Sequence, residues 1–174
     1  MWVQHVLSNG TGVVIRPVLA SDKPGLSLGL TRLSPESVYR RFLSPKPRFS
    51  SEELRYITEV DGHDHVALVA VLADDPEILV ASGRWVRDAA DPATAEVAIV
   101  VADGLQGQGL GSAIGRELAE AARANGVARF SAIMLPENTA ALRLFGAISD
   151  HLDHRVSRGV RELIAVLDPL PLAA

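Results

Sequence analysis

Four glycines stand within ten residues at positions 106–115, in the segment QGQGLGSAIG. The apolar run AEVAIVV at 95–101 precedes them and an alanine-rich run follows, so they lie where a strand leads into a helix. A helix N-terminus offers unpaired backbone N–H groups and the positive end of the helix dipole. Glycine lets that backbone approach a ligand and adopt positive φ. The segment predicts an anion site, most often for phosphate. The alternative is a connector that packs its strand and helix closely.

The order of the remaining elements predicts a mixed α/β fold in one domain over residues 1–174. Helix starts are expected at Ser21–Asp22, Ser34 and Ser50, and two more helices over 110–124 and 138–145. The helix after Ser34 should turn Val38, Tyr39 and Phe42 inward. Apolar runs predict strands at 12–17, 65–72, 78–86, 94–101, 127–134, 152–157 and 162–167. Strands 65–101 should form an antiparallel meander, and strands 94–101 and 127–134 a parallel crossover through the helix between them.

Charge and composition exclude several classes of protein. The net charge is −4, and the arginines are scattered without a basic patch, which argues against nucleic acid or membrane partners. There are no cysteines, so disulfides, cysteine zinc sites and an acyl-cysteine intermediate are excluded. The longest apolar run, 66–73, is too short to span a bilayer, and residues 1–5 show no signal-peptide pattern. We expect a cytoplasmic protein.

Two common phosphate-binding loops fit the glycine segment poorly. A Walker A loop needs Gly-Lys-Ser/Thr, whereas the segment reads Gly-Leu-Gly-Ser without lysine. A dinucleotide loop follows its strand closely and belongs to the first βα unit of a parallel sheet. Here residues 102–105 intervene and a predicted meander comes first, which disfavours dinucleotide binding.

The segment from Val101 to Gly111 resembles the acetyl-CoA signature of the GNAT N-acetyltransferases, Gln/Arg-x-x-Gly-x-Gly/Ala, through Gln106, Gly109 and Gly111. The segment NTAALRLF at 138–145 is similar to a second motif of that family. Other segments between residues 12 and 150 resemble the catalytic domain of bacterial Pat-type protein lysine acetyltransferases. The resemblance implies a central mixed, mostly antiparallel sheet of six to seven strands, flanked by helices, in which two parallel strands splay apart to hold the cofactor.

The resemblance also implies acetyl-CoA as co-substrate. The backbone of the last residues of strand 94–101 would contact the pantetheine arm, and the glycine loop would hold the pyrophosphate. Asn138 would touch the cofactor, cap its helix, or both. The implied cofactor-binding residues are Ile99, Val100, Val101, Gln106, Gly107, Gln108, Gly109, Leu110, Gly111, Ser112 and Asn138.

Glu96 is the candidate general base. An amine acceptor with a pKa near ~10.4 must lose a proton before it can attack, and Glu96 matches the glutamate that serves as base in Pat-like enzymes. It stands within an apolar strand, where enclosure would raise its pKa. The alternative is a glutamate that faces solvent. Phe145 replaces the tyrosine that many family members use as acid, so water would protonate the departing thiolate, or it would leave unaided.

The acceptor is expected to be a primary amine, on a small molecule or on a protein lysine, and the family resemblance allows a homodimer. A second hypothesis is a GNAT-like module that binds acyl-CoA without catalysis, because the usual tyrosine is absent. The polar segment at 61–65 reads as a loop before a strand rather than as a metal site. Neither it nor the pair His151 and His154 reads as a long helix, and no other soft ligand is available. No metal is expected.

Overall fold

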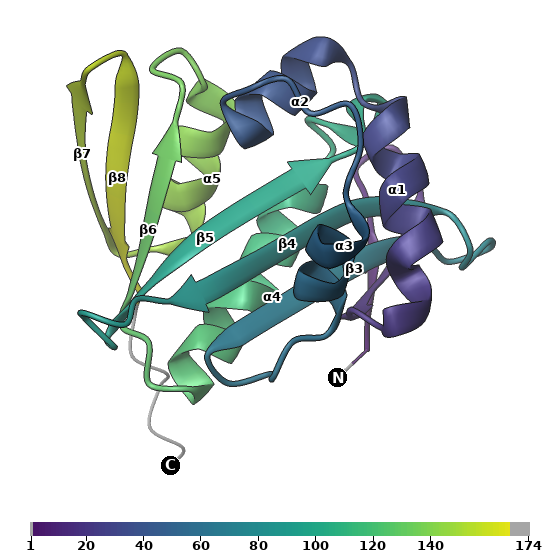
Figure 1. The fold of residues 1–174 in the computed structure, drawn as a ribbon, viewed down its shortest axis with the longest axis horizontal. Helices are drawn as coiled ribbons and strands as arrows, with labels where there is room; N and C mark the ends of the chain where they lie inside the picture. Colours follow the sequence, from purple (N-terminus) through teal and green to yellow (C-terminus); the bar gives the residue numbers. More distant parts are fainter. Residues whose placement is uncertain (1, 168–174) are drawn as a thin grey trace.

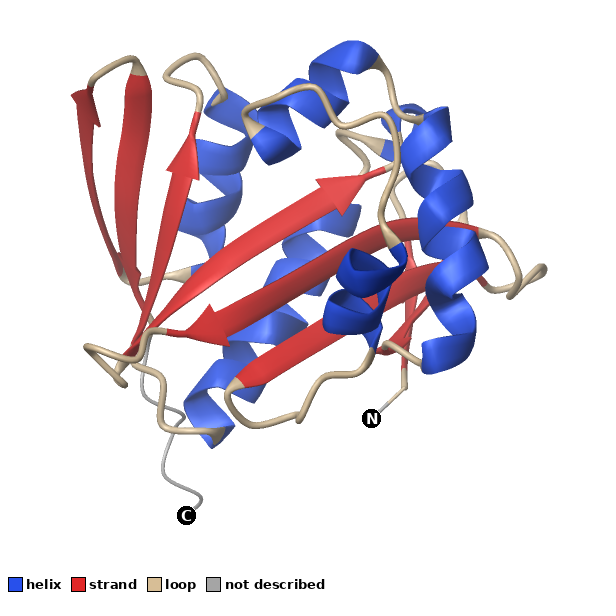
Figure 2. Cartoon of the chain, in the orientation of Figure 1, coloured by secondary structure: helices blue, strands red, loops and turns tan. Residues whose placement is uncertain are grey.

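The computed structural model describes residues 2–167 and shows eight strands in one mixed sheet (Figures 1 and 2). The strands are β1 (Val3–Val6), β2 (Gly12–Pro17), β3 (His65–Leu72), β4 (Leu79–Arg87), β5 (Thr94–Val101), β6 (Arg129–Met134), β7 (His151–Ser157) and β8 (Val160–Val166). Their order is β1-β2-β3-β4-β5-β6-β8-β7, and only the β5–β6 pair is parallel. The predicted fold class, meander and parallel crossover are confirmed. The eighth strand, β1, was not predicted.

Helices cover both faces of the sheet (Figure 1). One face carries α1 (Lys23–Arg32), α2 (Pro35–Phe42) and α3 (Ser51–Thr58), and the other carries α4 (Leu110–Ala124) and α5 (Thr139–Ile148). β3 is covered by helices on both faces, and seven of its eight residues are buried, which is why it reads as a continuous apolar run rather than an alternating one. Within residues 2–167, none of the helices combines the length and apolarity needed to cross a bilayer.

The main hydrophobic core lies between the sheet and α4. Trp85, Ile114, Leu118 and Phe130 are each 0% exposed within it. A smaller cluster around Val69 lies on the opposite face, beneath α1 and α3. The two cores hold the central strands rigidly, so the positions of groups along β4 and β5 are fixed by packing.

Side-chain caps start three of the helices. Ser34 accepts from the Ser37 N–H at 3.2 Å, and Ser50 forms a capping box with Glu53, which confirms both predicted starts. Asp22, in contrast, does not cap α1. Its carboxylate instead binds the Arg16 guanidinium at 2.7 and 2.8 Å. A bidentate ion pair is a stronger interaction than a single hydrogen bond to a helix amide.

Candidate functional site

The parallel strands β5 and β6 form a fork. They pair only at Thr94–Arg129, Ala95–Phe130 and Glu96–Ser131, and beyond Glu96 they part. Figure 1 shows β5 and β6 diverging toward α2, with α5 behind the opening. The predicted splaying of the parallel strands is therefore confirmed, and Glu96 stands at its apex.

A cleft of about 600 Å³ occupies the fork. Its walls come from β5, β6, the glycine loop, the start of α4, and α5, with Ser37, Arg40 and Arg41 of α2 at its rim. Nine of the eleven residues predicted to bind the cofactor line it: Ile99, Val100, Val101, Gln106, Gly107, Gly109, Gly111, Ser112 and Asn138. The fold thus gathers residues from positions 99–138 around one space.

The backbone of β5 turns alternate groups toward the cleft. The Val101 carbonyl accepts from the Gln106 side chain, on the cleft side, whereas the Ala102 N–H donates to Val80 of β4. The backbone N–H and C=O groups alternate in direction along a strand. The backbone groups that face the cleft are therefore those of Val97, Ile99 and Val101, whereas the backbone groups of Val100 face β4. The side chain of Val100 still lines the cleft. Val97 was missed by the sequence analysis, since its role depends on where β6 departs.

Two of the loop glycines are required by backbone conformation. Gly107 and Gly109 have φ of 73° and 91°, and nothing lies within 4 Å of a Cβ at either position. Other residues would cost roughly 1–2 kcal/mol each in this left-handed region. Gly109 is the N-cap of α4 and has no side chain to bind the helix amides. The N-termini of α2, α3 and α5 are all capped by side chains.

The first turn of α4 therefore leaves its donors available to a ligand. The first intrahelical bond runs from the Ala113 N–H to the Gly109 carbonyl at 3.0 Å. The amides of Leu110, Gly111 and Ser112 have no acceptor within the helix, and they lie at the end of the helix dipole that attracts anions.

The other two glycines allow close packing, which was the alternative explanation from the sequence. A Cβ on Gly111 would lie 3.0 Å from the Leu144 side chain, and one on Gly115 would lie 3.3 Å from it. Both contacts are with α5, so α5 is brought close to the start of α4. The segment thus serves both purposes, with Gly107 and Gly109 shaping the loop and Gly111 and Gly115 admitting α5.

Gln106 holds the loop to α2. Its side-chain nitrogen lies 3.0 Å from both Ser37 Oγ and Asp103 Oδ1, and 3.1 Å from the Val101 carbonyl. Asp103 also accepts from the Ser37 hydroxyl and from the Ser34 N–H. The signature glutamine thus positions the loop with its side chain, and any contact with a cofactor at this residue would be additional.

Two of the predicted cofactor residues turn their side chains away from the cleft. Gln108 accepts a hydrogen bond from the Ser8 hydroxyl at 2.6 Å, and Leu110 is 0% exposed in the main core. Only their backbone groups stay available for the predicted binding role.

Removal of the Asp103 carboxylate is expected to loosen α2 and to do so in a pH-dependent way. Burial opposes ionisation of Asp103, but hydrogen bonds from Ser37 and Ser34 outweigh it and lower its pKa below the ordinary 3.8. A lowered folded pKa means that the stabilisation is present above pH 3.8 and is lost as the pH falls through the folded value. Because the carboxylate is largely exposed, Asp103→Ala should cost roughly 1 kcal/mol of unfolding free energy at pH 7.

Chemical denaturation of the wild-type protein and Asp103→Ala between pH 7 and pH 3 checks this pH dependence. The difference in unfolding free energy should shrink toward the acid end of the range. Parallel curves over the whole range would show that the Asp103 contacts contribute nothing through ionisation.

The cleft is electropositive. Arg40, Arg41 and Arg143 line it, and no carboxylate of a described residue does. Arg40 is partly neutralised by Glu36 at 2.6 Å. Arg143 joins the two arginines of α2 only in the folded chain, because it is far from them in the sequence and the fold brings α5 beside α2. A polyanionic ligand fits such a cleft.

Glu96 has an exposed side chain, so the enclosure considered from the sequence is absent. It projects on the same face as Ala98 and Val100, since these residues alternate with the buried Val97. Its negative charge acts on Arg41 and Arg84, which lie nearby. The position at the apex of the fork leaves Glu96 open to solvent and to an incoming acceptor.

Asn138 and Phe145 belong to α5. Asn138 is the N-cap and accepts from the Ala141 N–H at 3.1 Å, which confirms the predicted cap. Phe145 is 5% exposed and lines the cleft. The position of the usual tyrosine thus faces the cleft but carries no hydroxyl.

The polar segment before β3 is a structured turn. The Asp61 carboxylate accepts from the N–H groups of His63, Asp64 and His65 at 2.8–2.9 Å, and these bonds lower its pKa to about 2. Within residues 2–167, no group of three or more acidic, histidine or cysteine side chains is arranged to hold a metal ion.

The chain is similar to known acetyltransferases. The model of the acetyltransferase (GNAT) family matches residues 35–147. Acetyltransferase Pat of Mycolicibacterium smegmatis is 36% identical over 131 residues, which cover 75% of this chain and 39% of the relative. The present chain thus matches about two fifths of that protein.

Solved structures of acetyltransferases share the fold of this chain. The GNAT domain of S. lividans PAT has a TM-score of 0.84 and 32% identity, covering 95% of this chain and 97% of that domain. A phosphinothricin acetyltransferase of Sinorhizobium meliloti, solved in complex with acetyl-CoA, shares the fold with a TM-score of 0.72 at 16% identity, covering 89% of this chain and 88% of that one.

Proposed function

Because this chain belongs to the GNAT family of acetyltransferases, we propose that it transfers the acetyl group of acetyl-CoA to a primary amine by direct attack in a ternary complex. Glu96 is the general base in this proposal. The acceptor is a small amine or a protein lysine. The observation that carries it is the fork between β5 and β6, which opens at Glu96 onto a cleft lined by arginines and by the uncapped end of α4.

The residues present fit coenzyme A. The free amides of Leu110, Gly111 and Ser112, together with the loop at Gly107, would hold the diphosphate. The backbone groups of β5 that face the cleft would pair with the amide groups of the pantetheine arm, as an added strand edge would. The arginines of the cleft would offset the remaining negative charge. Support for this assignment is the donor set itself and the acetyl-CoA bound by a protein of the same fold.

Acetyl-CoA supplies the acetyl group as an activated thioester. The attacking amine forms a C–N bond to the carbonyl carbon while the C–S bond breaks, and the proton of the amine passes to Glu96. Glu96 is exposed, so it can release that proton to bulk water. A backbone N–H of β5 in the fork would stabilise the developing oxyanion, and one such donor is worth about 3 kcal/mol.

No side chain is available to form a covalent acyl-cysteine, because the chain has no cysteine. Phe145, where many relatives have tyrosine, cannot donate a proton to the departing thiolate. A thiol with a pKa of about 8.5 leaves as thiolate without assistance near pH 8, and water protonates it afterward. The loss of the tyrosine is therefore compatible with turnover.

A thiol-release assay tests the proposal. Acetyl-CoA is incubated with the full chain and a panel of amines, including a lysine-containing peptide, and free coenzyme A is measured while mass spectrometry identifies the acetylated product. We expect amine-dependent thiol release with one acetyl group added per thiol. Tight binding of acetyl-CoA without release over the whole panel and a cell lysate would support the non-catalytic binding module instead.

A further inference from the structure

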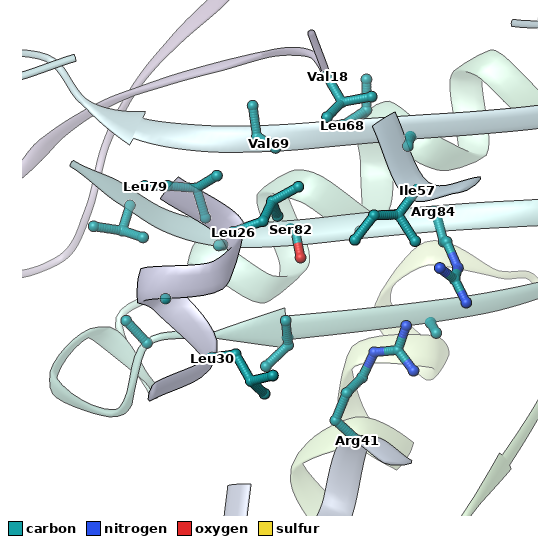
Figure 3. A pocket seen from close by; sticks show the side chains of 18 of the residues that line it. Val18, Leu26, Leu30, Arg41, Ile57, Leu68, Val69, Leu79, Ser82 and Arg84 are labelled. Atoms are coloured by element: carbon teal, nitrogen blue, oxygen red, sulfur yellow. The ribbon is translucent and has the colours of Figure 1, made fainter. Parts of the chain in front are cut away.

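A second cavity, of about 80 Å³, lies between the sheet and the helices α1, α2 and α3. Its lining is apolar except for Ser82, Arg41 and Arg84. Leucine side chains of α1 close one end, and the two arginines stand at the other (Figure 3). A single water needs about 10–15 Å³, so the cavity has room for a small hydrocarbon group.

The two guanidinium groups point toward one another from different elements. Arg41 projects from α2 and Arg84 from β4 (Figure 3). Each lies over an aromatic ring: Arg41 Cζ is 4.9 Å from the centroid of Phe42, and Arg84 Cζ is 5.4 Å from that of Tyr56. Each guanidinium offers five N–H donors. Neither guanidinium donates a hydrogen bond to an acceptor on residues 2–167. No carboxylate oxygen of these residues lies within 4.0 Å of a guanidinium nitrogen of either arginine.

Two half-buried guanidinium groups side by side repel one another and leave N–H donors available to a ligand. Burial and the neighbouring charge of Arg84 together lower the pKa of Arg41 to about 10, and burial also lowers the pKa of Arg84. Both remain cationic at pH 7. Glu96 is the carboxylate whose charge acts on both, and it compensates only one of the two positive charges. One further negative charge would make the group neutral.

The cavity adjoins the proposed acetyl-CoA cleft. Arg41, Ala98 and Val100 line both spaces. Glu96 is on the same face of β5 as Ala98 and Val100. A molecule that reaches from the apex of the fork toward α1 would thus pass the two arginines first and apolar side chains next.

We propose that Arg41 and Arg84 form a carboxylate-binding subsite, and that the apolar cavity behind them holds the hydrocarbon part of the same small molecule. The carboxylate could belong to the amine acceptor, as in an amino acid with an apolar side chain, or to the far end of the transferred acyl group. The question of which substrate carries the carboxylate rests on the proposed acyl transfer. The existence of the subsite does not rest on it.

Binding tests the subsite independently of turnover. The probes are 4-methylpentanoate and its neutral counterpart 4-methylpentanamide, titrated into the full chain with coenzyme A present. The Nε–H signals of Arg41 and Arg84 are followed by NMR. We expect the carboxylate to bind at least about tenfold more tightly than the amide and to shift both signals. Equal affinities for the two probes would overturn the proposal, and this comparison needs no variant.

Variants then assign the preference to the arginines. Arg84→Gln and Arg41→Gln should each abolish the preference for the carboxylate. They should not lower the unfolding temperature, because each removes one of two half-buried like charges that repel one another. Arg116→Gln makes the same charge change on the exposed surface of α4 and is the control. A preference that persists in both cavity variants would overturn the proposal.

Turnover distinguishes the source of the carboxylate. L-leucine is compared with L-leucinamide at equal concentrations of unprotonated amine, and succinyl-CoA with acetyl-CoA. An acceptor carboxylate predicts a preference of at least about tenfold for leucine, and an acyl carboxylate the same for succinyl-CoA. If amines are acetylated without either preference, neither substrate supplies the carboxylate; the proposed function then stands, and the NMR titration decides the subsite. If no amine reacts, the proposed function fails and the NMR titration still decides the subsite.

Discussion

Replacing Glu96 by glutamine is expected to lower kcat/KM for amine acetylation by roughly 100-fold to 10,000-fold, the range that a positioned general base contributes. Glutamine keeps the shape of the side chain at the apex of the fork but cannot accept the amine proton. The affinity for acetyl-CoA should not change, because the cleft residues that would hold it are untouched. Steady-state kinetics and calorimetric titration with acetyl-CoA measure the two quantities.

Glu96→Asp is the matched control. It retains the carboxylate on a shorter side chain, so its activity should fall between those of the wild-type protein and Glu96→Gln. Wild-type turnover in Glu96→Gln across the pH range would remove this residue from the mechanism. A parallel loss of acetyl-CoA affinity would instead assign it a role in binding.

Ser112→Glu is expected to weaken acetyl-CoA binding and to stabilise the fold at the same time. Ser112 is the third residue of α4 and lines the cleft beside the free amides. A carboxylate there would occupy the donors and repel a diphosphate. Affinity should fall by about 100-fold, which corresponds to the loss of two charge-assisted hydrogen bonds at roughly 1.4 kcal/mol each. The same negative charge in the first turn interacts favourably with the helix dipole and should raise the unfolding free energy by about 0.3–1 kcal/mol.

Ser112→Gln controls for size without charge. Its affinity for acetyl-CoA should fall much less than that of Ser112→Glu, and its unfolding free energy should stay close to that of the wild type. Calorimetry and chemical denaturation on the three proteins give both quantities. If Ser112→Glu binds acetyl-CoA as tightly as Ser112→Gln, the diphosphate does not lie at the start of α4.

Local sequence patterns predicted much of the fold because each pattern has a local cause. The capping serines Ser34 and Ser50, and the strand–glycine–helix order around Gly109, depend on neighbours within a few residues. β1 was missed because it is four residues long and half-exposed, without a strong apolar run. Tyr39 was expected to face inward but is 47% exposed.

Tertiary contacts explain the errors in the site. Ser37, rather than Tyr39, is the buried residue of α2, because its hydroxyl bonds to Asp103 across 66 residues of sequence. The proximity of Arg41 to Arg84 likewise depends on how α2 docks against β5, the neighbour of β4 in the sheet. The glycine segment predicted an anion site but could not separate the residues that need left-handed φ from those that admit α5, since that division depends on α5 itself.

A crystal structure of the chain with bound coenzyme A tests the central claim most directly. The account predicts the diphosphate within hydrogen-bonding distance of the amides of Gly107 to Ser112, and the pantetheine arm between β5 and β6 with its sulfur near the Glu96 end of the fork. Coenzyme A bound at another surface, or in the cleft with its diphosphate away from the start of α4, would contradict it.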